Sequence, residues 1–284
     1  MLSRQRAAVV GSPVAHSLSP VLHRAAYVAL GLSQWTFELH RLEPEELPAF
    51  VAGLNEQWRG LSVTMPLKEA ALALADDASV VARQTGAANT LVHHADRWQA
   101  HNTDVVGICS ALMDAGVRRA AGGSAVVLGS GATARSALAA LEGLGITDVT
   151  LAVRDRARDQ TLCQAADMGI TATVISLADA PAAMVSAAVV VSTLPAGAAD
   201  PVAAAMKDLS DDRGCPPGVL LDVVYAGWPT PLGLAAQRVG FCVVPGIEML
   251  IHQGAEQVRL MTGLPAPLAA MQTAGRAAQG TPAS

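Results

Sequence analysis

The sequence predicts an α/β protein with two domains, and three observations support this fold class. Short apolar runs alternate with longer segments in which apolar residues recur at helical spacing. This alternation is typical of parallel sheets that helices cover on both faces. A charged connector with two glycines at 117–124 separates two such series, and 284 residues provide enough chain for two domains of ordinary size.

The series before the connector combines strands, helices and one hairpin. Its strands are expected at 7–11, 35–42 and 61–65, and its first helices at 20–30, 45–54 and 66–75. Residues 89–94 and 97–102 predict a β-hairpin that turns near Ala95 and Asp96. A further helix is expected to begin at Thr103 and to run to Asp114.

The series after the connector has the pattern of repeated strand–helix units. An apolar strand leads into a glycine-containing loop at 128–135 and a helix from about 133 to 144. Later strands are expected at 148–153, 172–176, 187–193, 218–224 and 241–245. The last strong pattern, at 247–263, predicts an amphipathic helix.

Composition narrows the class of protein. Hydrophobic residues make up 51% and charged residues 15%, which fits a compact globular chain. The net charge is −5 and no basic block occurs, so we expect neither nucleic acid nor a membrane as a partner. The N-terminal residues lack the long apolar region of a signal peptide, and we expect a cytoplasmic protein.

Cysteines give no sign of a metal site. The four cysteines are scattered, without a CxxC pair or a cluster with histidines, and we expect reduced thiols and no metal. They are Cys109, Cys163, Cys215 and Cys242.

Two serines precede the first predicted helix. Pro20 suits the first helical position and Ser19 suits the N-cap, so Ser19 has a structural explanation. Ser17 has none, because one cap is enough. Two hydroxyls beside a helix N-terminus predict either an ordinary loop or a site for an anion such as a carboxylate.

The loop LGSGATAR at 128–135 lies between an apolar strand and a helix, which is the context of a dinucleotide fingerprint. Gly129 permits the tight turn, and Gly131 lets a pyrophosphate approach the backbone. Ala134 stands where the third glycine usually lies. We therefore expect a nucleotide-binding domain of the Rossmann type.

The end of the next strand bears on which nucleotide is bound. An NAD site needs an acid there for the ribose hydroxyl, whereas arginines suit the 2′-phosphate of NADP. Arg154 comes first, followed by Arg156 and Arg158, which favours NADP. Asp155 keeps NAD open, and a solvated basic loop is the plainer alternative.

Two charged residues are candidates for catalysis. Lys68 is expected in the first turn of a helix that begins at Pro66, where the helix dipole disfavours a cation. Asp104 is expected in the first turn of another helix, where an acid is favoured and Asn102 or Thr103 caps. A catalytic role requires the two side chains to meet, and the alternative is two ordinary surface charges.

Eight segments, in order, resemble the shikimate dehydrogenase family along nearly the whole chain. They match patterns such as S-x-S-P, V-T-x-P-x-K, N-T-D-x-x-G and D-x-x-Y. In this chain they read GSPVAHSLSPVLH, SVTMPLK, TGAANTLV, HNTDVVG, GSGATAR, VRDRAR, DVVYAGWPTPL and GIEMLIHQ.

The resemblance implies a role for each matched residue. Ser17 and Ser19 would bind the substrate carboxylate, and Lys68 and Asp104 would form the catalytic pair. Substrate hydroxyls and the region near the nicotinamide would be contacted by Thr64, Asn89, Gln253 and Tyr225. Cofactor binding would fall to Gly129, Ser130, Gly131, Ala132, Thr133, Ala134, Arg154, Arg158, Thr193 and Gly246.

The implied reaction is NADPH-dependent, reversible reduction of 3-dehydroshikimate to shikimate, a step toward chorismate and the aromatic amino acids. Lys68 would supply the proton and Asp104 would orient it. The implied architecture places residues 1–104 and 247–284 in a substrate domain and 118–243 in an NADP-binding Rossmann domain, as a monomer or homodimer. C-terminal helices would return to the first domain.

The chain departs from the family patterns at four positions. Ser62 replaces an asparagine near the substrate, Ala132 a glycine, and Val153 and Ser192 asparagines of the cofactor loops. Two rivals stay open: an NAD-dependent quinate/shikimate dehydrogenase, and a sensor that binds ligand and nucleotide without turnover. The arginine at 154 and Ser19 argue against the first, and the presence of Lys68 and Asp104 argues against the second.

Overall fold

The computed structural model describes residues 4–119, 123–208 and 218–279. The chain divides into two compact units, Met1–Asp104 with Leu250–Ser284, and Val105–Met249. Both crossings lie in helices, at the start of α5 (Asp104–Asp114) and inside α11 (Gly246–Thr262). Residues 120–122 of the predicted connector lie outside the described residues, as does Cys215.

The first unit is built on a six-stranded mixed sheet in the order β2-β1-β3-β5-β6-β4. Parallel pairing joins β1 to β2 and β3, whereas β5 pairs antiparallel with β3 and β6. The strands are β1 (Gln5–Gly11), β2 (Trp35–Arg41), β3 (Trp58–Val63), β4 (Asp77–Ala78), β5 (Thr90–His94) and β6 (Arg97–His101). The predicted hairpin is confirmed, with Ala95 and Asp96 both at positive φ in its turn.

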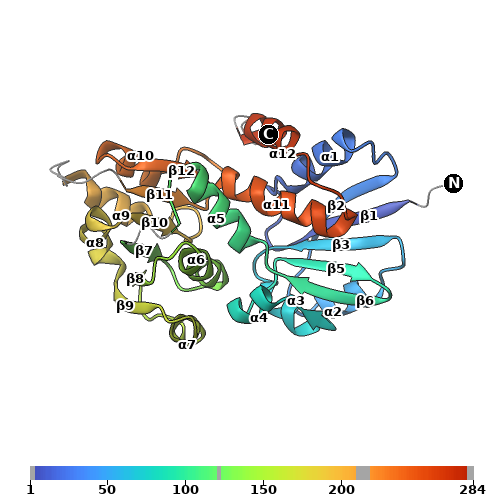
Figure 1. Ribbon diagram of the computed structural model, residues 1–284, viewed down its shortest axis with the longest axis horizontal. Helices are drawn as coiled ribbons and strands as arrows, with labels where there is room; N and C mark the ends of the chain where they lie inside the picture. The colour runs from blue at the N-terminus through green and yellow to red at the C-terminus, as the bar shows by residue number, and fades with distance from the viewer. Residues whose placement is uncertain (1–3, 120–122, 209–217, 280–284) are drawn as a thin grey trace. The chain divides into compact units, whose positions relative to one another are not determined.

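Helices cover both faces of this sheet, as Figure 1 shows for α1 and α12 on one face and α2 to α4 on the other. Strand β1 explains why: Ala7 and Val9 pack into one core cluster, and Ala8 and Val10 into another. Because α12 packs on α1, the prediction that C-terminal helices return to the first unit is confirmed. The helices are α1 (Ser19–Ala29), α2 (Leu47–Ala52), α3 (Lys68–Leu74), α4 (Val80–Thr85) and α12 (Leu268–Gln279).

The second unit contains a parallel six-stranded sheet in the order β12-β11-β10-β7-β8-β9. Two three-strand halves meet at β7 and β10, which is the strand order of the predicted Rossmann-type fold. The strands are β7 (Ser124–Leu128), β8 (Asp148–Val153), β9 (Thr171–Ser176), β10 (Val189–Ser192), β11 (Val219–Asp222) and β12 (Cys242–Pro245). Besides α5 and the start of α11, its α-helices are α6 (Ala132–Gly143), α7 (Asp159–Asp167), α8 (Ala180–Ser186), α9 (Asp200–Ala205) and α10 (Pro231–Arg238).

The starts of α1 and α3 differ from the sequence prediction at residues of the candidate site. Leu18 is already in a helical conformation, so Ser19 is the first residue of α1 and not its N-cap. The N-cap position is taken by Leu18 and no side chain caps the helix, although the hydroxyl of Ser17 accepts the backbone N–H of Ser19 at 3.3 Å. Helix α3 begins at Lys68, because residues 64–67 first close a turn in which the N–H of Leu67 donates to the carbonyl of Thr64.

Candidate active site

Lys68 and Asp104 meet in the first unit. Each is the first residue of its helix, α3 and α5, and Nζ lies 2.5 Å from Oδ2. The side chains are only 13% and 6% exposed, so the ion pair is largely shielded from solvent. Of the two predicted capping residues, Asn102 lies two positions before the helix, and its Oδ1 accepts the N–H of Asp104 at 3.1 Å.

The second oxygen of Asp104 is held by Asn89, the residue before β5. Asn89 Oδ1 accepts the backbone N–H of Thr103 at 2.7 Å, which fixes which end of the amide is the acceptor. Its Nδ2 therefore faces Oδ1 of Asp104 at 2.8 Å. Both carboxylate oxygens thus have a donor of the protein, and the carboxylate cannot rotate without losing one of them.

Gln253 of α11 completes this cluster. Its Oε1 accepts Nδ2 of Asn89 at 3.2 Å, and its Nε2 donates to the carbonyl of Leu250. The side chain is buried, and its contacts all lie within the first unit. Of the residues predicted from sequence, the structure brings together Lys68, Asn89, Asp104 and Gln253.

The predicted carboxylate-binding serines lie at the same edge of the first sheet as this cluster. Ser17 and Ser19 follow β1, while Thr64 and Lys68 follow β3, and the carboxyl ends of these paired parallel strands meet. The N–H of Ser12 donates to the carbonyl of Met65, which ties the two segments together. The segments that carry these polar residues therefore leave the sheet at one edge.

Tyr225, predicted to contact the substrate, belongs to the second unit. It lies in the segment from β11 to α10, and Asp222 holds both ends of that segment through the N–H of Val224 and the hydroxyl of Thr230. Burial raises the pKa of the Asp222 carboxyl, against the opposite effect of the Thr230 hydrogen bond.

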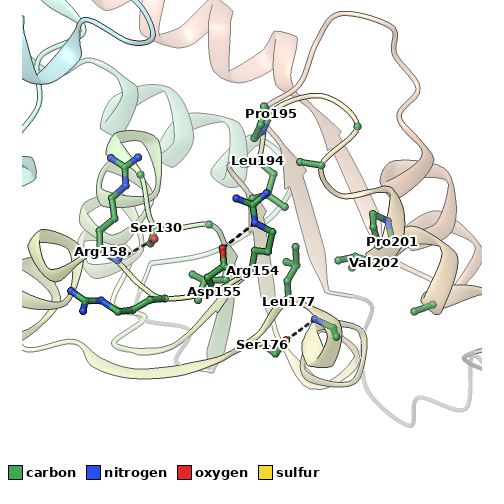
Figure 2. A pocket seen from close by; sticks show the side chains of 18 residues that line it. Ser130, Arg154, Asp155, Arg158, Ser176, Leu177, Leu194, Pro195, Pro201 and Val202 are labelled. Carbon is green, nitrogen blue, oxygen red and sulfur yellow. Dashed lines mark hydrogen bonds and ion pairs between the residues drawn. The ribbon is translucent and has the colours of Figure 1, made fainter.

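A pocket of about 820 Å³ opens at the carboxyl ends of four strands of the second sheet. Segments after β7, β8, β9 and β10 surround it, on both sides of the point where the strand order reverses (Figure 2). The glycine loop and the arginines were predicted from the sequence, and Thr193 was predicted at the end of β10, but the lining residues after β9 and beyond Thr193 were not. These lining residues include Ser176, Leu177, Leu194, Pro195 and Gly197.

The glycine loop fits a bound pyrophosphate. Gly129 has φ +107°, and a Cβ there would lie 2.7 Å from the Thr193 hydroxyl, so a side chain is excluded. A Cβ on Gly131 would meet no atom within 4 Å, which leaves open space in front of the backbone. Gly131 is also the N-cap of α6 and caps with no side chain, so a phosphate can take the N–H groups of the first turn.

Three arginines line this pocket beside the end of β8. The Arg154 and Asp155 side chains are 88% and 80% exposed and form an ion pair at 3.2 Å. Arg156 pairs with Asp159, and the backbone N–H of Arg158 donates to the Ser130 hydroxyl (Figure 2). The exposed guanidinium groups suit the 2′-phosphate of NADP, while Asp155 is engaged by a cation.

The other predicted cofactor residues do not line the pocket. Thr193 donates its hydroxyl to the carbonyl of Leu128, and a Cβ on Gly246 would lie 2.3 Å from the carbonyl oxygen of Val223. Both residues thus have a packing reason at these positions. The remaining three, in the first turn of α6, are Ala132, Thr133 and Ala134.

Comparison with known proteins identifies the family to which the chain is related. A family model described as the shikimate dehydrogenase substrate binding domain matches residues 9–91, and one described as the shikimate 5′-dehydrogenase C-terminal domain matches 246–274. The NADP(+) shikimate dehydrogenase of Symbiobacterium thermophilum is 36% identical over 95% of this chain and 93% of its own. That of Halobacterium salinarum is 38% identical over 95% and 97%. The chain belongs to the shikimate dehydrogenase family.

Solved structures of this family have the same fold. A shikimate dehydrogenase from Mycobacterium tuberculosis has a TM-score of 0.81 at 44% identity and covers 96% of this chain and 99% of its own. An enzyme from Thermus thermophilus, solved with NADP(H) and shikimate, has a TM-score of 0.80 at 33% identity, over 96% and 99%.

The described residues contain neither a cluster of metal-ligating side chains nor a helix suited to a membrane. No group of three or more His, Cys, Asp or Glu side chains suited to a metal ion occurs among them. Within residues 4–119, 123–208 and 218–279, no helix combines the length and apolar character needed to cross a bilayer.

Proposed function

We propose that this chain is an NADP-dependent shikimate dehydrogenase, an oxidoreductase that interconverts 3-dehydroshikimate and shikimate. The observation that carries the proposal is the shielded pair of Lys68 and Asp104, held by Asn89 beside Gln253. Relatives named shikimate dehydrogenase (NADP(+)) match nearly the whole chain and support the same reaction. The reaction belongs to chorismate and aromatic amino-acid biosynthesis.

When bound, NADPH supplies the hydride to the ketone carbon of the substrate, and NADP⁺ accepts it in the reverse direction. The protein itself supplies the proton and stabilises the charge that develops on the substrate oxygen. Reduction leaves negative charge on the former ketone oxygen, and the ammonium group of Lys68 stabilises that charge and donates a proton. In oxidation Lys68 takes the proton back as the base. Asp104 keeps Lys68 oriented through the 2.5 Å contact.

Recognition of the substrate is assigned to the polar edge of the first unit. Ser17 and Ser19 would bind the carboxylate, and the side chains of Thr64, Asn89 and Gln253 would bind ring hydroxyls. Tyr225 would contact the substrate near the nicotinamide. This assignment is supported by the convergence of these segments, apart from Tyr225, at one sheet edge.

Recognition of NADP is assigned to the pocket of the second unit. Gly129, Ser130 and Gly131, with the following turn of Ala132, Thr133 and Ala134, would hold the pyrophosphate. Arg154 and Arg158 would hold the 2′-phosphate, and Thr193 and Gly246 would shape the nicotinamide side. The open space at Gly131 and the exposed arginines support it.

We further propose a cytoplasmic monomer or homodimer. The described cysteines Cys109, Cys163 and Cys242 are free thiols, which suits a reducing compartment.

The direct test is a set of initial rates with the purified protein. Shikimate and quinate are each combined with NADP⁺ and with NAD⁺, and nucleotide reduction is followed by absorbance. Rapid reduction with shikimate and NADP⁺ and little with the other pairs is the expected result. A preference for NAD⁺ or quinate contradicts the assigned specificity, and nucleotide binding without any turnover contradicts the enzyme.

A further inference from the structure

We infer that Thr90, Gln257 and His23 are positioning residues that fix the Asn89 amide and, through it, Asp104; this inference rests on the proposed function. None of these three side chains forms a hydrogen bond with Lys68 or Asp104. Instead they form a buried chain of hydrogen bonds that ends at Asn89. All three side chains are completely buried, so solvent cannot replace these partners.

The orientation of Gln257 follows from one partner that can only accept. Its Nε2 lies 3.2 Å from the backbone carbonyl of Asn89 and 2.9 Å from Oγ1 of Thr90. A carbonyl cannot donate, so Nε2 is the donor and Oε1 is the end that faces His23. The Gln257 amide therefore has one arrangement.

This arrangement decides the tautomer of His23. Gln257 Oε1 accepts at 3.2 Å, so Nε2 of His23 carries the hydrogen. Nδ1 is then the acceptor for the Tyr27 hydroxyl at 3.5 Å. Burial lowers the pKa of His23 to about 4, which keeps this neutral form at ordinary pH. The ring is stacked on Phe37 at 4.0 Å, which fixes its plane.

Thr90 connects Gln257 to Asn89. Its hydroxyl accepts from Gln257, and it donates its single hydrogen to Asn89 Oδ1 at 2.8 Å, because that oxygen can only accept. Every donor in the chain therefore points the same way, from Tyr27 through His23, Gln257 and Thr90 to Asn89, and on to Asp104. Hydrogen bonds aligned in series strengthen one another, and this series ends on a carboxylate.

Ser62 also contacts this chain of hydrogen bonds, through Gln257. Its hydroxyl is buried and accepts from Gln257 Nε2 at 3.2 Å. The departure noted from the family's asparagine therefore places a short side chain against the long Gln257. A longer residue at position 62 would compete for the space and the hydrogen bond of Gln257.

The test compares two variants of one residue. Thr90→Val keeps the shape of the side chain and removes the hydroxyl, whereas Thr90→Ser keeps the hydroxyl. Gln257 retains Ser62 and the Asn89 carbonyl in Thr90→Val, and Asn89 Oδ1 retains Thr103, so we expect both variants to fold. Folding is checked by thermal unfolding.

The expected kcat with shikimate and NADP⁺ is about tenfold lower in Thr90→Val, the scale of one buried hydrogen bond, and within about twofold of the parent in Thr90→Ser. The KM for NADP⁺ stays unchanged in both, because the nucleotide pocket belongs to the second unit. A second readout needs no turnover: solvent exchange of the Asn89 side-chain amide hydrogens, measured by NMR without ligands. Exchange is faster in Thr90→Val and parent-like in Thr90→Ser.

Two results overturn the inference. One is Thr90→Val with parent-like kcat and parent-like exchange, and the other is Thr90→Ser impaired as much as Thr90→Val, which indicates a packing role only. Failure of the proposed function is recognised separately. If the parent does not oxidise shikimate while the exchange difference persists, the positioning of Asn89 stands and the assigned reaction falls.

Discussion

Lys68 and Asp104 form an ion pair across 36 positions of sequence, and each stands at the beginning of a helix. The two places differ in their local preference. A helix N-terminus favours the carboxylate of Asp104 and disfavours the ammonium of Lys68, by about 0.3–1 kcal/mol at exposed sites. The contact offsets this cost for Lys68, and it holds the lysine where its own helix does not favour a cation.

Replacing Lys68 with alanine tests this pair as the source of the proton. Lys68→Ala is expected to lower kcat by about 10²–10⁴-fold, the usual contribution of a general acid–base group, with a much smaller change in the KM for shikimate. Steady-state rates in both directions measure the effect. Lys207→Ala is the matched control, because Lys207 is exposed and lies in the other unit. An unchanged kcat in Lys68→Ala contradicts the assignment.

The two glycines of the nucleotide loop separate folding from ligand binding. Gly129→Ala forces a positive φ on alanine and a 2.7 Å contact with the Thr193 hydroxyl, so we expect a loss of about 1–2 kcal/mol in the free energy of unfolding. Gly131→Ala meets open space and should leave that free energy within about 0.5 kcal/mol.

Nucleotide binding by Gly131→Ala then reports what occupies the open space. If a pyrophosphate approaches the backbone there, the KM for NADP⁺ rises about tenfold or more while folding is intact. Urea unfolding and titration with NADP⁺ measure the two properties on the same sample. Parent-like affinity in Gly131→Ala excludes a close approach of the ligand at this glycine.

Features set by local chemistry were predictable from the sequence, and those set by distant partners were not. The turn at Ala95 and Asp96, the glycine loop and the parallel strands all appear where periodicity and turn residues place them. The prediction of Ser19 as the N-cap of α1 was wrong, because the helix begins one residue earlier than expected and Leu18 takes the N-cap position.

The buried polar residues of the first unit likewise show which contacts a local sequence pattern does not predict. Gln253 and Gln257 lie four residues apart on α11, and this spacing in the sequence indicates that both side chains lie on the same face of the helix. One partner of Gln257 is His23, 234 positions away, and no local pattern predicts that contact. The alternation of strands and helices likewise predicted helices between the later strands without fixing the ends of α7 to α10.

The choice between NADP and NAD can be tested at Arg154. Arg154→Ser removes a guanidinium that the 2′-phosphate would share, and we expect the KM for NADP⁺ to rise about tenfold or more. The KM for NAD⁺ should fall or stay constant, because Asp155 loses its ion-pair partner and can accept the ribose hydroxyl. Arg41→Ser is the control, because Arg41 is also an exposed arginine, lies in the first unit and pairs with Glu43. Equal changes with both nucleotides would argue against a phosphate contact.

His23 makes the stability of the fold depend on pH in a definite direction. Burial lowers its pKa from 6.5 to about 4 in the folded chain, partly opposed by the Gln257 hydrogen bond. As pH falls below 6.5, His23 therefore binds a proton in the unfolded chain but stays neutral in the folded chain until pH approaches 4. Stability is present in full above pH 6.5 and is lost as pH falls toward 4.

Replacing His23 with glutamine should flatten this dependence. Between pH 7 and pH 5 the histidine accounts for about 2 kcal/mol of lost unfolding free energy, by linkage. Other groups, such as Glu38 with its pKa lowered by Arg6, also make the fold less stable on acidification. Their effect is the same in the parent and the variant, so only the difference between the two proteins is assigned to His23. Urea unfolding at pH 7 and pH 5 should give a smaller drop for His23→Gln than for the parent, even though the variant is less stable at pH 7 through its lost stacking on Phe37. The exposed His94, changed to glutamine, should keep the parent's drop, and an equal drop in His23→Gln would mean that His23 is not held neutral by burial.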